Sequence, residues 1–279
     1  MEYIELNIDV TSSQQAEIIT AMLEDFPFEA FTEEGSTLKA YIPATDYTDC
    51  KDSVARTLAN LGINDYSAIN IKQQNWNSEW ESNFEAVEVA GECPICIRAQ
   101  HHSTPKEGVI DVVIAPQMSF GTGHHTTTAL MAQTISQMEV DGLRGLDMGC
   151  GTGVLAIVAV KCGAKSMVAV DIDDWACESC VESIALSEVA DAVEVRCGSM
   201  EQVTAGEKFD FILANINRNI LISMMPSFAE ALDSGGKLAL SGFLAEDIMP
   251  IEAAAAEQGF TLESSQVKDN WVVAVCKKL

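Results

Sequence analysis

The chain has 279 residues, of which 48% are hydrophobic, and a mean hydropathy of +0.12, as is typical of a soluble globular protein with a buried core. No apolar run approaches the roughly 20 residues that span a bilayer, and Glu2 and Glu5 stand where a signal peptide carries basic residues. We therefore expect a cytoplasmic protein without a membrane partner. Nine cysteines, an odd number, then favour reduced thiols.

The net charge of −26 argues against nucleic acids as direct partners. Residues 1–90 alone hold 17 acidic and 4 basic residues. Such a surface repels the phosphates of nucleic acids and gains nothing from counterion release, so we expect no direct nucleic-acid contact. The acidity either attracts a basic partner or only keeps the protein in solution, and composition leaves both open.

Residues 1–73 are predicted to form a small domain of their own. Apolar residues alternate over 3–10, which indicates a strand, and Thr11 or Ser12 can cap the helix that follows to about residue 25. The further elements expected are a hairpin over 28–32 and 37–42, a helix over 46–61 and a strand over 66–73. This β-α-β-β-α-β order is that of a ferredoxin-like α+β sandwich. Because the domain has no glycine loop and no catalytic cluster, we expect substrate recognition, with a purely architectural role as the alternative.

Residues 74–93 are predicted to connect this domain to a larger one over 94–279. Trp76 and Trp80 lie four residues apart, so they share one face of a short connecting helix and are expected to pack on a domain. Three strands are predicted around the start of the second domain, over 85–89, 95–99 and 109–114.

From about residue 142 onward, strands and helices alternate. The predicted strands cover 143–148, 166–170, 193–196, 209–214, 237–241, 261–267 and 271–276, and the predicted helices cover 154–162, 173–186, 219–232 and 245–258. Such alternation predicts an α/β fold with a doubly wound, mostly parallel sheet of seven strands. The last two strands, joined by residues 268–270, are expected to form an antiparallel pair.

A glycine-rich turn follows the first strand of this sheet. Gly149, Gly151 and Gly153 form a G-x-G-x-G pattern, with Asp147 two residues before the first glycine. A dinucleotide fingerprint needs a small residue where Val154 stands. The pattern resembles the S-adenosylmethionine (AdoMet) loop of class I methyltransferases, in which glycines let the ligand approach the backbone. An ordinary tight turn between strand and helix is the alternative.

Two acidic residues complete this pattern. Asp171 ends the next strand, where it would accept hydrogen bonds from the ribose hydroxyls of AdoMet. Asp147 would hold the ammonium group of the ligand, directly or through water. We therefore expect AdoMet as the cofactor, with S-adenosylhomocysteine as its product.

Asn215 ends the strand over 209–214 and is the candidate catalytic residue. Methyl transfer from a sulfonium needs mainly positioning and a lone pair on the acceptor, and the amide oxygen of Asn215 would orient an acceptor amine near AdoMet. Methyltransferases that act on planar amides or bases usually carry prolines and an aromatic residue after this Asn, whereas this chain has Ile216, Asn217 and Arg218. An aliphatic amine is therefore the expected acceptor. The alternative role of Asn215 is to cap the following helix.

The stretch over 119–128 combines glycines, hydroxyls and two histidines before a helix. Together with the glycine loop, residues 171–173 and residues 214–216, it resembles the ribosomal protein L11 methyltransferases (PrmA type). The family often has Thr-His-Pro at 124–126, where this chain has His-His-Thr. The family also tends to have a tryptophan where Trp271 stands, and we expect this residue to be a packing residue.

The resemblance implies an AdoMet-dependent protein-lysine N-methyltransferase. Its implied substrate is L11, a basic protein of the ribosomal stalk base, which the enzyme would bind before L11 is assembled into the ribosome. L11 would be trimethylated at lysine side chains and at its N-terminal amine. The cofactor contacts implied or expected are Phe120, Thr127, Thr128, Asp147, Gly149, Gly151, Gly153, Asp171 and Asn215.

Other functions remain open at this stage. They are methylation of another basic protein, of a small amine or of RNA, and a non-catalytic AdoMet-binding adaptor; a nicotinamide oxidoreductase is disfavoured by Val154.

The C-x-x-C pairs that begin at Cys93 and Cys177 have 80 residues between them, so we expect no zinc site. All four histidines occur as adjacent pairs, whose side chains diverge on a strand, so we expect no other metal.

Overall fold

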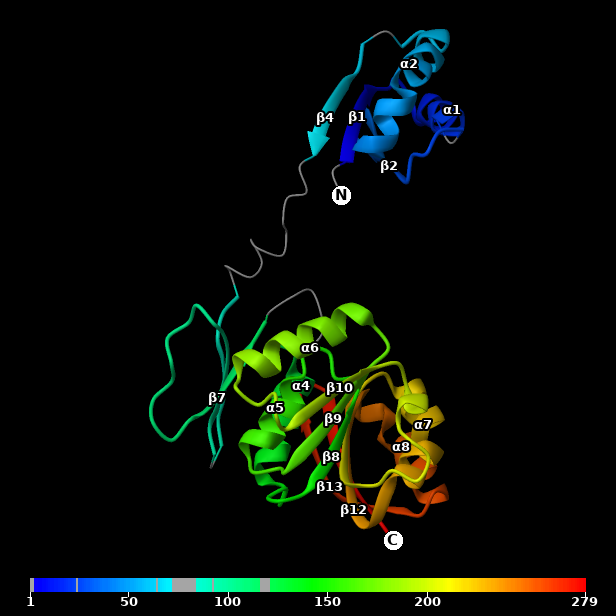
Figure 1. The fold of residues 1–279 in the computed structure, drawn as a ribbon. Helices are drawn as coiled ribbons and strands as arrows, with labels where there is room; N and C mark the ends of the chain where they lie inside the picture. Colours follow the sequence, from blue (N-terminus) through cyan, green and yellow to red (C-terminus); the bar gives the residue numbers. More distant parts are fainter. Residues whose placement is uncertain (1–2, 24, 64, 72–83, 92, 116–120) are drawn as a thin grey trace. The chain divides into compact units, whose positions relative to one another are not determined.

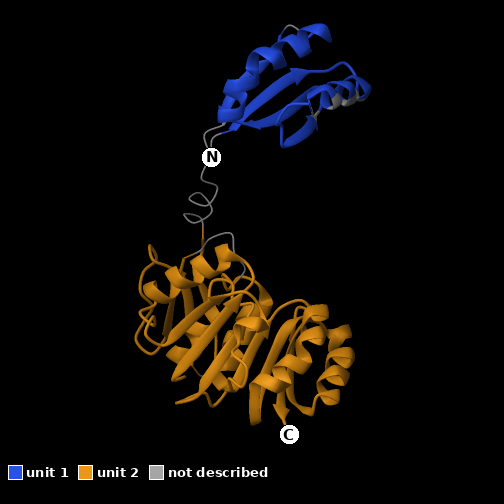
Figure 2. Ribbon diagram, turned by 45° about the vertical axis from the view of Figure 1, so that its right-hand side comes forward, with its two compact units in different colours: residues 1–79 blue, residues 80–279 orange. Residues whose placement is uncertain are grey.

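The computed structural model describes residues 3–23, 25–63, 65–71, 84–91, 93–115 and 121–279 (Figure 1). The chain divides into two compact units, residues 1–79 and 80–279, which Figure 2 colours blue and orange. The connecting helix predicted around Trp76 and Trp80 lies outside the described residues. Among the described residues, no helix has both the length and the apolar character to cross a bilayer.

The first unit is the ferredoxin-like sandwich that the element order predicts. Its elements are β1 (Tyr3–Asp9), α1 (Ser13–Leu23), β2 (Ala30–Glu34), β3 (Thr37–Pro43), α2 (Ala44–Asn60) and β4 (Ser67–Ile71). The strands form an antiparallel sheet in the order β2-β3-β1-β4. Alternation places Leu6 and Ile8 on one face of β1, where they form a core with Val54 and Leu58 of α2.

The second unit contains the seven-stranded sheet of a class I methyltransferase, as expected. The strands are β8 (Arg144–Met148), β9 (Ser166–Asp171), β10 (Val193–Cys197), β11 (Phe209–Asn215), β12 (Leu232–Leu244), β13 (Phe260–Lys268) and β14 (Trp271–Lys278). Their order is β10-β9-β8-β11-β12-β14-β13. The first five strands are parallel, whereas β14 runs antiparallel to both β12 and β13.

Helices cover both faces of this sheet (Figure 1). They are α4 (Thr126–Gln137), α5 (Val154–Lys161), α6 (Asp174–Leu186), α7 (Arg218–Ala231) and α8 (Ile248–Glu257), with short 3-10 turns η1 (Met200–Gln202) and η2 (Ala245–Asp247). The apolar residues of α4 and α5 belong to one core cluster, and those of α7 and α8 belong to a second. The sheet is therefore buried on both sides, which explains why its central strands are continuous apolar runs.

A separate sheet of three strands packs against α6. It consists of β5 (Val87–Val89), β6 (Ile95–Ala99) and β7 (Ile110–Ile114), with β6 antiparallel to β5 and parallel to β7.

Buried serines of α6 satisfy the backbone along β7. Ser187 Oγ accepts from Val113 N and donates to Val113 O, both at 2.8 Å, and Ser183 Oγ accepts from Ala115 N at 3.0 Å. Ser179 Oγ donates to Ala115 O at 3.3 Å. The i, i+4, i+8 spacing puts the three hydroxyls on one helix face, so they take the place of a further strand.

Two cysteines of the second unit lie side by side. Cys177 and Cys197 have a Cα–Cα distance of 6.0 Å. The register of β10 with β9 places Cys197 beside Asp171, and α6 begins only three residues after Asp171. Tertiary structure thus brings together two cysteines that lie 20 residues apart in sequence.

Replacing Ser187 by Ala should destabilise the second unit by about 1–3 kcal/mol, because both backbone groups of Val113 lose their buried partner. Denaturant unfolding of Ser187→Ala measures this loss. In the exposed control Ser223→Ala, which also removes a hydroxyl bonded to a backbone carbonyl, the free energy of unfolding should change by at most about 0.5 kcal/mol. Equal effects in the two variants would contradict this account of how β7 is held.

Candidate active site

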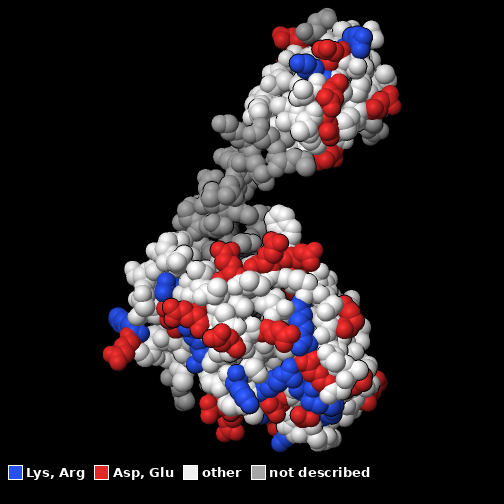
Figure 3. All heavy atoms as spheres, in the orientation of Figure 1, with Lys and Arg blue, Asp and Glu red and all other residues white. Residues whose placement is uncertain are grey.

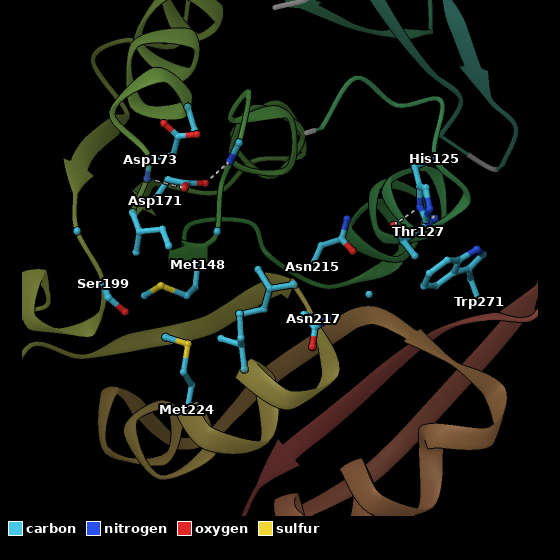
Figure 4. A pocket seen from close by; sticks show the side chains of 18 residues that line it. His125, Thr127, Met148, Asp171, Asp173, Ser199, Asn215, Asn217, Met224 and Trp271 are labelled. Atoms are coloured by element: carbon cyan, nitrogen blue, oxygen red, sulfur yellow. Dashed lines mark hydrogen bonds between the residues drawn. The ribbon is translucent and has the colours of Figure 1, made fainter. Parts of the chain in front are cut away.

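A cavity of about 520 Å³ opens at the carboxyl ends of the parallel strands (Figure 4). In an open α/β sheet this edge is where ligands bind. The lining residues come from the turn after β8 (Met148, Gly149, Gly151), the end of β9 and start of α6 (Asp171, Ile172, Asp173, Ala176), the segment after β10 (Gly198, Ser199), the end of β11 and α7 (Asn215, Ile216, Asn217, Ile220, Met224), the start of α4 (His125, Thr127), and Gly242 and Trp271.

Gly149 and Gly153 of the glycine turn lie so close to neighbouring residues that a side chain at either position would overlap them. Gly149 has φ +74°, and a Cβ there would lie 2.2 Å from Cγ2 of Ile216. Gly153, with φ +75°, is the N-cap of α5 and packs against Cys180, whose Sγ would lie 2.5 Å from a Cβ. The turn therefore needs glycine both for its left-handed backbone and for its approach to β11 and α6.

Asp171 joins the glycine turn to the start of α6. Its Oδ2 accepts from Gly151 N at 2.9 Å and its Oδ1 accepts from Asp173 N at 3.1 Å, as Figure 4 shows. Two backbone donors thus fix the orientation of the carboxylate at one end of the cavity. The remaining lone pairs can accept from two neighbouring hydroxyls, the pattern that a ribose presents.

Asp147 lies beneath the glycine turn rather than in the cavity wall. It is fully buried, its Oδ2 accepts from Ala156 N at 3.1 Å, and its Oδ1 has no hydrogen-bond partner. Burial, with the nearby charge of Asp171, raises the pKa of Asp147 to about 7. A cationic group nearby would restore the ionised form and satisfy the free oxygen.

Three buried side-chain oxygens have no hydrogen-bond partner within the described ranges, and all three belong to residues that the sequence singles out. They are Thr128 Oγ1, Asp147 Oδ1 and Asn215 Oδ1. Buried polar atoms in folded proteins are nearly always paired, so unpaired oxygens from three elements indicate a missing polar ligand. A ligand with an ammonium group and hydroxyls, such as AdoMet, fits these oxygens together with Asp171.

Asn215 does not cap the following helix. The N-cap of α7 is Asn217, whose side chain accepts from Asn219 N at 3.0 Å. Asn215 is instead only 8% exposed, lines the cavity and keeps its Oδ1 unpaired. The alternative that Asn215 caps the following helix is therefore wrong.

The structure brings together most of the expected site residues. Thr127, Gly149, Gly151, Asp171 and Asn215 line the cavity, while Thr128, Asp147 and Gly153 lie behind its wall. Phe120 lies outside the described residues.

The aromatic end of the cavity was not predicted. His125 is the N-cap of α4, with Nδ1 accepting from Thr127 N at 3.3 Å, and its ring meets that of Trp271 edge to face at 4.7 Å. Trp271, expected to be only a packing residue, also lines the cavity. His124 does not line the cavity, and its ring packs against Phe84.

Among the described residues, no three His, Cys, Asp or Glu side chains gather as a metal site would require.

Comparison with known proteins identifies the family. Residues 3–279 match the family described as ribosomal protein L11 methyltransferase (PrmA). This chain belongs to that family. A relative of that name from Porphyromonas gingivalis is 39% identical over 94% of this chain and 91% of its own length, and one from Bacteroides fragilis is 36% identical over 97% and 98%. The solved ribosomal protein L11 methylase of Lactobacillus delbrueckii subsp. bulgaricus has a TM-score of 0.63 and 27% identity, covering 70% of this chain and 99% of that chain.

The residues around the cavity agree with membership of the L11 methyltransferase family. The chain is a methyltransferase with AdoMet as its methyl donor, and its seven-stranded sheet, glycine turn and Asp171 occupy the places that such a donor requires.

In this family member, Gly149→Ala should weaken AdoMet binding about tenfold or more, a loss of about 1.4 kcal/mol, because the new methyl group forces the turn away from Ile216. Calorimetric titration with AdoMet measures the change. Gly142→Ala is the matched control: Gly142 has φ +72° and open space around its Cα, so that variant has the same backbone strain but should keep wild-type affinity. An unchanged affinity in Gly149→Ala would contradict the required close approach.

The raised pKa of Asp147 predicts a pH dependence of ligand-free stability. Since the folded-state pKa of about 7 lies above the ordinary value of 3.8, the folded protein holds this proton more tightly than the unfolded chain, and stability falls as the pH rises towards 7. Relative to Asp147→Asn, the wild type should lose about 2 kcal/mol of unfolding free energy between pH 5.5 and pH 8. Urea unfolding at both pH values tests this, and a constant difference between the two proteins would contradict it.

Proposed function

We propose that this enzyme methylates ribosomal protein L11, adding up to three methyl groups to lysine side chains and to the N-terminal amine. The names of the curated relatives support L11 as the substrate. The observation that carries the amine chemistry is the buried, unpaired Oδ1 of Asn215, which lines the cavity between Asp171 and Trp271 (Figure 4).

Each cofactor contact is proposed from its position. Asp171 accepts from the ribose hydroxyls, and the backbone of Gly149 and Gly151 lies against the ligand. Asp147 holds the ammonium group, directly or through water, and the buried Thr128 Oγ1 is proposed as a further contact from behind the cavity wall. Thr127 lines the cavity beside it, and Gly153 keeps the turn tight. Phe120, outside the described residues, is proposed as a contact from the family motif alone.

When bound, AdoMet supplies a methyl group on a positively charged sulfur, which a neutral amine nitrogen can take. Asn215 Oδ1 accepts a hydrogen bond from the amine and so aims its lone pair. Since lysine has a pKa near 10.4 in water, it must lose a proton first. The carboxylates among the described lining residues, Asp171 and Asp173, lie at the far end of the cavity from Trp271 (Figure 4). Desolvation and proton loss to water therefore supply the lone pair.

The first unit is proposed to recognise the substrate. Figure 3 shows acidic side chains on the face of residues 3–71 in view, with few basic ones. This charge suits a basic protein and repels RNA. We propose that L11 is bound free, before ribosome assembly, in the cytoplasm and without direct nucleic-acid contact.

The proposal is tested by incubating purified, unmethylated L11 with the enzyme and AdoMet and measuring its intact mass. A ladder of methyl additions is expected, and fragmentation should place them on lysine side chains and the N-terminal amine. An unmodified L11, with AdoMet binding confirmed in the same sample, would overturn L11 as the substrate.

Asn215→Ala should lower kcat about 10²–10³-fold, because the amine loses the acceptor that orients it in the transition state. A methylation time course on L11 measures kcat, and AdoMet titration checks that the variant still binds the donor. Asn219→Ala is the control, since Asn219 is an exposed residue of α7 outside the cavity wall. Wild-type turnover by Asn215→Ala would remove Asn215 from the mechanism.

A further inference from the structure

The end of the cavity away from Asp171 is walled by two aromatic rings. His125 and Trp271 both line the cavity, with ring centroids 4.7 Å apart and an interplanar angle of 69°. In Figure 4 they lie beside Thr127 on one side of Asn215, and Asp171 and Asp173 lie on the other side. The proposed cofactor contacts of Asp171 use the opposite end, so this wall faces the acceptor.

The sheet order places Trp271 close to Asn215. Strands β11, β12 and β14 are neighbours, and Trp271 begins β14 at the edge where Asn215 ends β11. Two strand spacings, about 10 Å, separate β11 from β14, and Trp271 lies beyond Val273, the residue of β14 that is level with Asn215 through Ser241. Between them, Gly242 of β12 has no side chain, and a Cβ there would lie 2.3 Å from the backbone oxygen of Ile216. Gly242 thus lies directly against the backbone of Ile216, and it lines the cavity together with Asn215 and Trp271.

A hydrogen bond couples the two elements that carry the rings. The turn between β13 and β14 has positive φ at Asp269 (50°) and Asn270 (66°), which brings Trp271 back along the sheet. Asp269 Oδ2 accepts from Thr126 Oγ1 at 3.2 Å, and Thr126 follows His125 at the start of α4. This contact links the turn that precedes Trp271 to the start of α4, next to His125.

We propose that Trp271, with His125 against it, binds the amine after it has gained methyl groups, and that Asp269 is the residue that positions Trp271. The proposal rests on the proposed function and deepens it, because it assigns residues to the later methyl transfers. Aromatic faces attract alkylammonium cations, whose methyl groups make them easy to desolvate. The same wall accepts the apolar surface that each methyl group adds.

The chemistry of successive transfers explains the need for such a wall. In each round one N–C bond forms, the S–C bond of the donor breaks, and one proton leaves the acceptor ammonium for water. The acceptor thus loses one N–H per round and finally has none left to donate to Asn215. Positive charge passes from sulfur to nitrogen in every round, and the indole face stabilises it there.

A binding experiment tests this without turnover. The enzyme, loaded with S-adenosylhomocysteine, is titrated by NMR with Nα-acetyl-Nε-trimethyl-lysine amide and with the neutral analogue that has carbon in place of the charged nitrogen. The wild type should prefer the cation about fivefold to tenfold. Trp271→Leu should abolish the preference, whereas Trp271→Phe should retain most of it. Equal affinities in the wild type, or an unchanged preference in Trp271→Leu, would overturn the proposal.

The product ladder on L11 gives a second readout. Trp271→Leu should shift the products from trimethylated to monomethylated and dimethylated amines, and Asp269→Gly should shift them in the same direction. Asn270→Gly is the matched control, because it places glycine in the same turn but leaves the bond from Thr126 intact. A wild-type ladder from Trp271→Leu or Asp269→Gly would overturn the assigned role.

The two proposals fail in different ways. L11 left unmodified by the wild type contradicts the substrate assignment, and the binding titration still decides whether Trp271 recognises methylated amines. Trimethylated L11 from both the wild type and Trp271→Leu contradicts only the role of the tryptophan.

Discussion

The site depends on the close approach of the glycine turn to the end of β11. A Cβ at Gly149 would overlap Ile216, so the backbone of the turn and the residues after Asn215 meet in direct contact. This contact sets the floor of the cavity. Asp171, held by Gly151 N, lies at one end of the cavity, and Asn215 lies in its wall. The parallel register of β8, β9 and β11 aligns the three strand ends that make this possible.

The polar residues around this contact are arranged for a ligand rather than for stability. Asp147 is buried with one oxygen unpaired, and its raised pKa shows that the folded protein resists its charge. Thr128 and Asn215 add two more unpaired oxygens. By contrast, the buried serines along β7 have their hydroxyls paired with backbone groups. Unsatisfied groups concentrated at one sheet edge are typical of a functional site.

Local signals explain how much of this could be predicted. The apolar runs, the glycine spacing and Asp171 are properties of short segments, so the doubly wound sheet and the donor end of the cavity followed from them. The end of the cavity next to His125 and Trp271 could not be predicted from such local signals. It joins residues 125–127, 215–217 and 271, which come from three distant segments. Trp271 has no local signal that separates a cavity wall from a core position. The proximity of Cys177 and Cys197 was missed for the same reason.

The fold class, the ferredoxin-like first unit and the choice of Asn215 as a candidate could be predicted from periodicity and motif spacing, which act over a few residues, and the resemblance to class I methyltransferases added the methyl donor. Two contacts could be seen only in the folded chain: Asn217, not Asn215, caps α7, and Asp269 accepts a hydrogen bond from Thr126. These contacts depend on strand order and on the direction of β14, which are set when distant segments pack into one sheet.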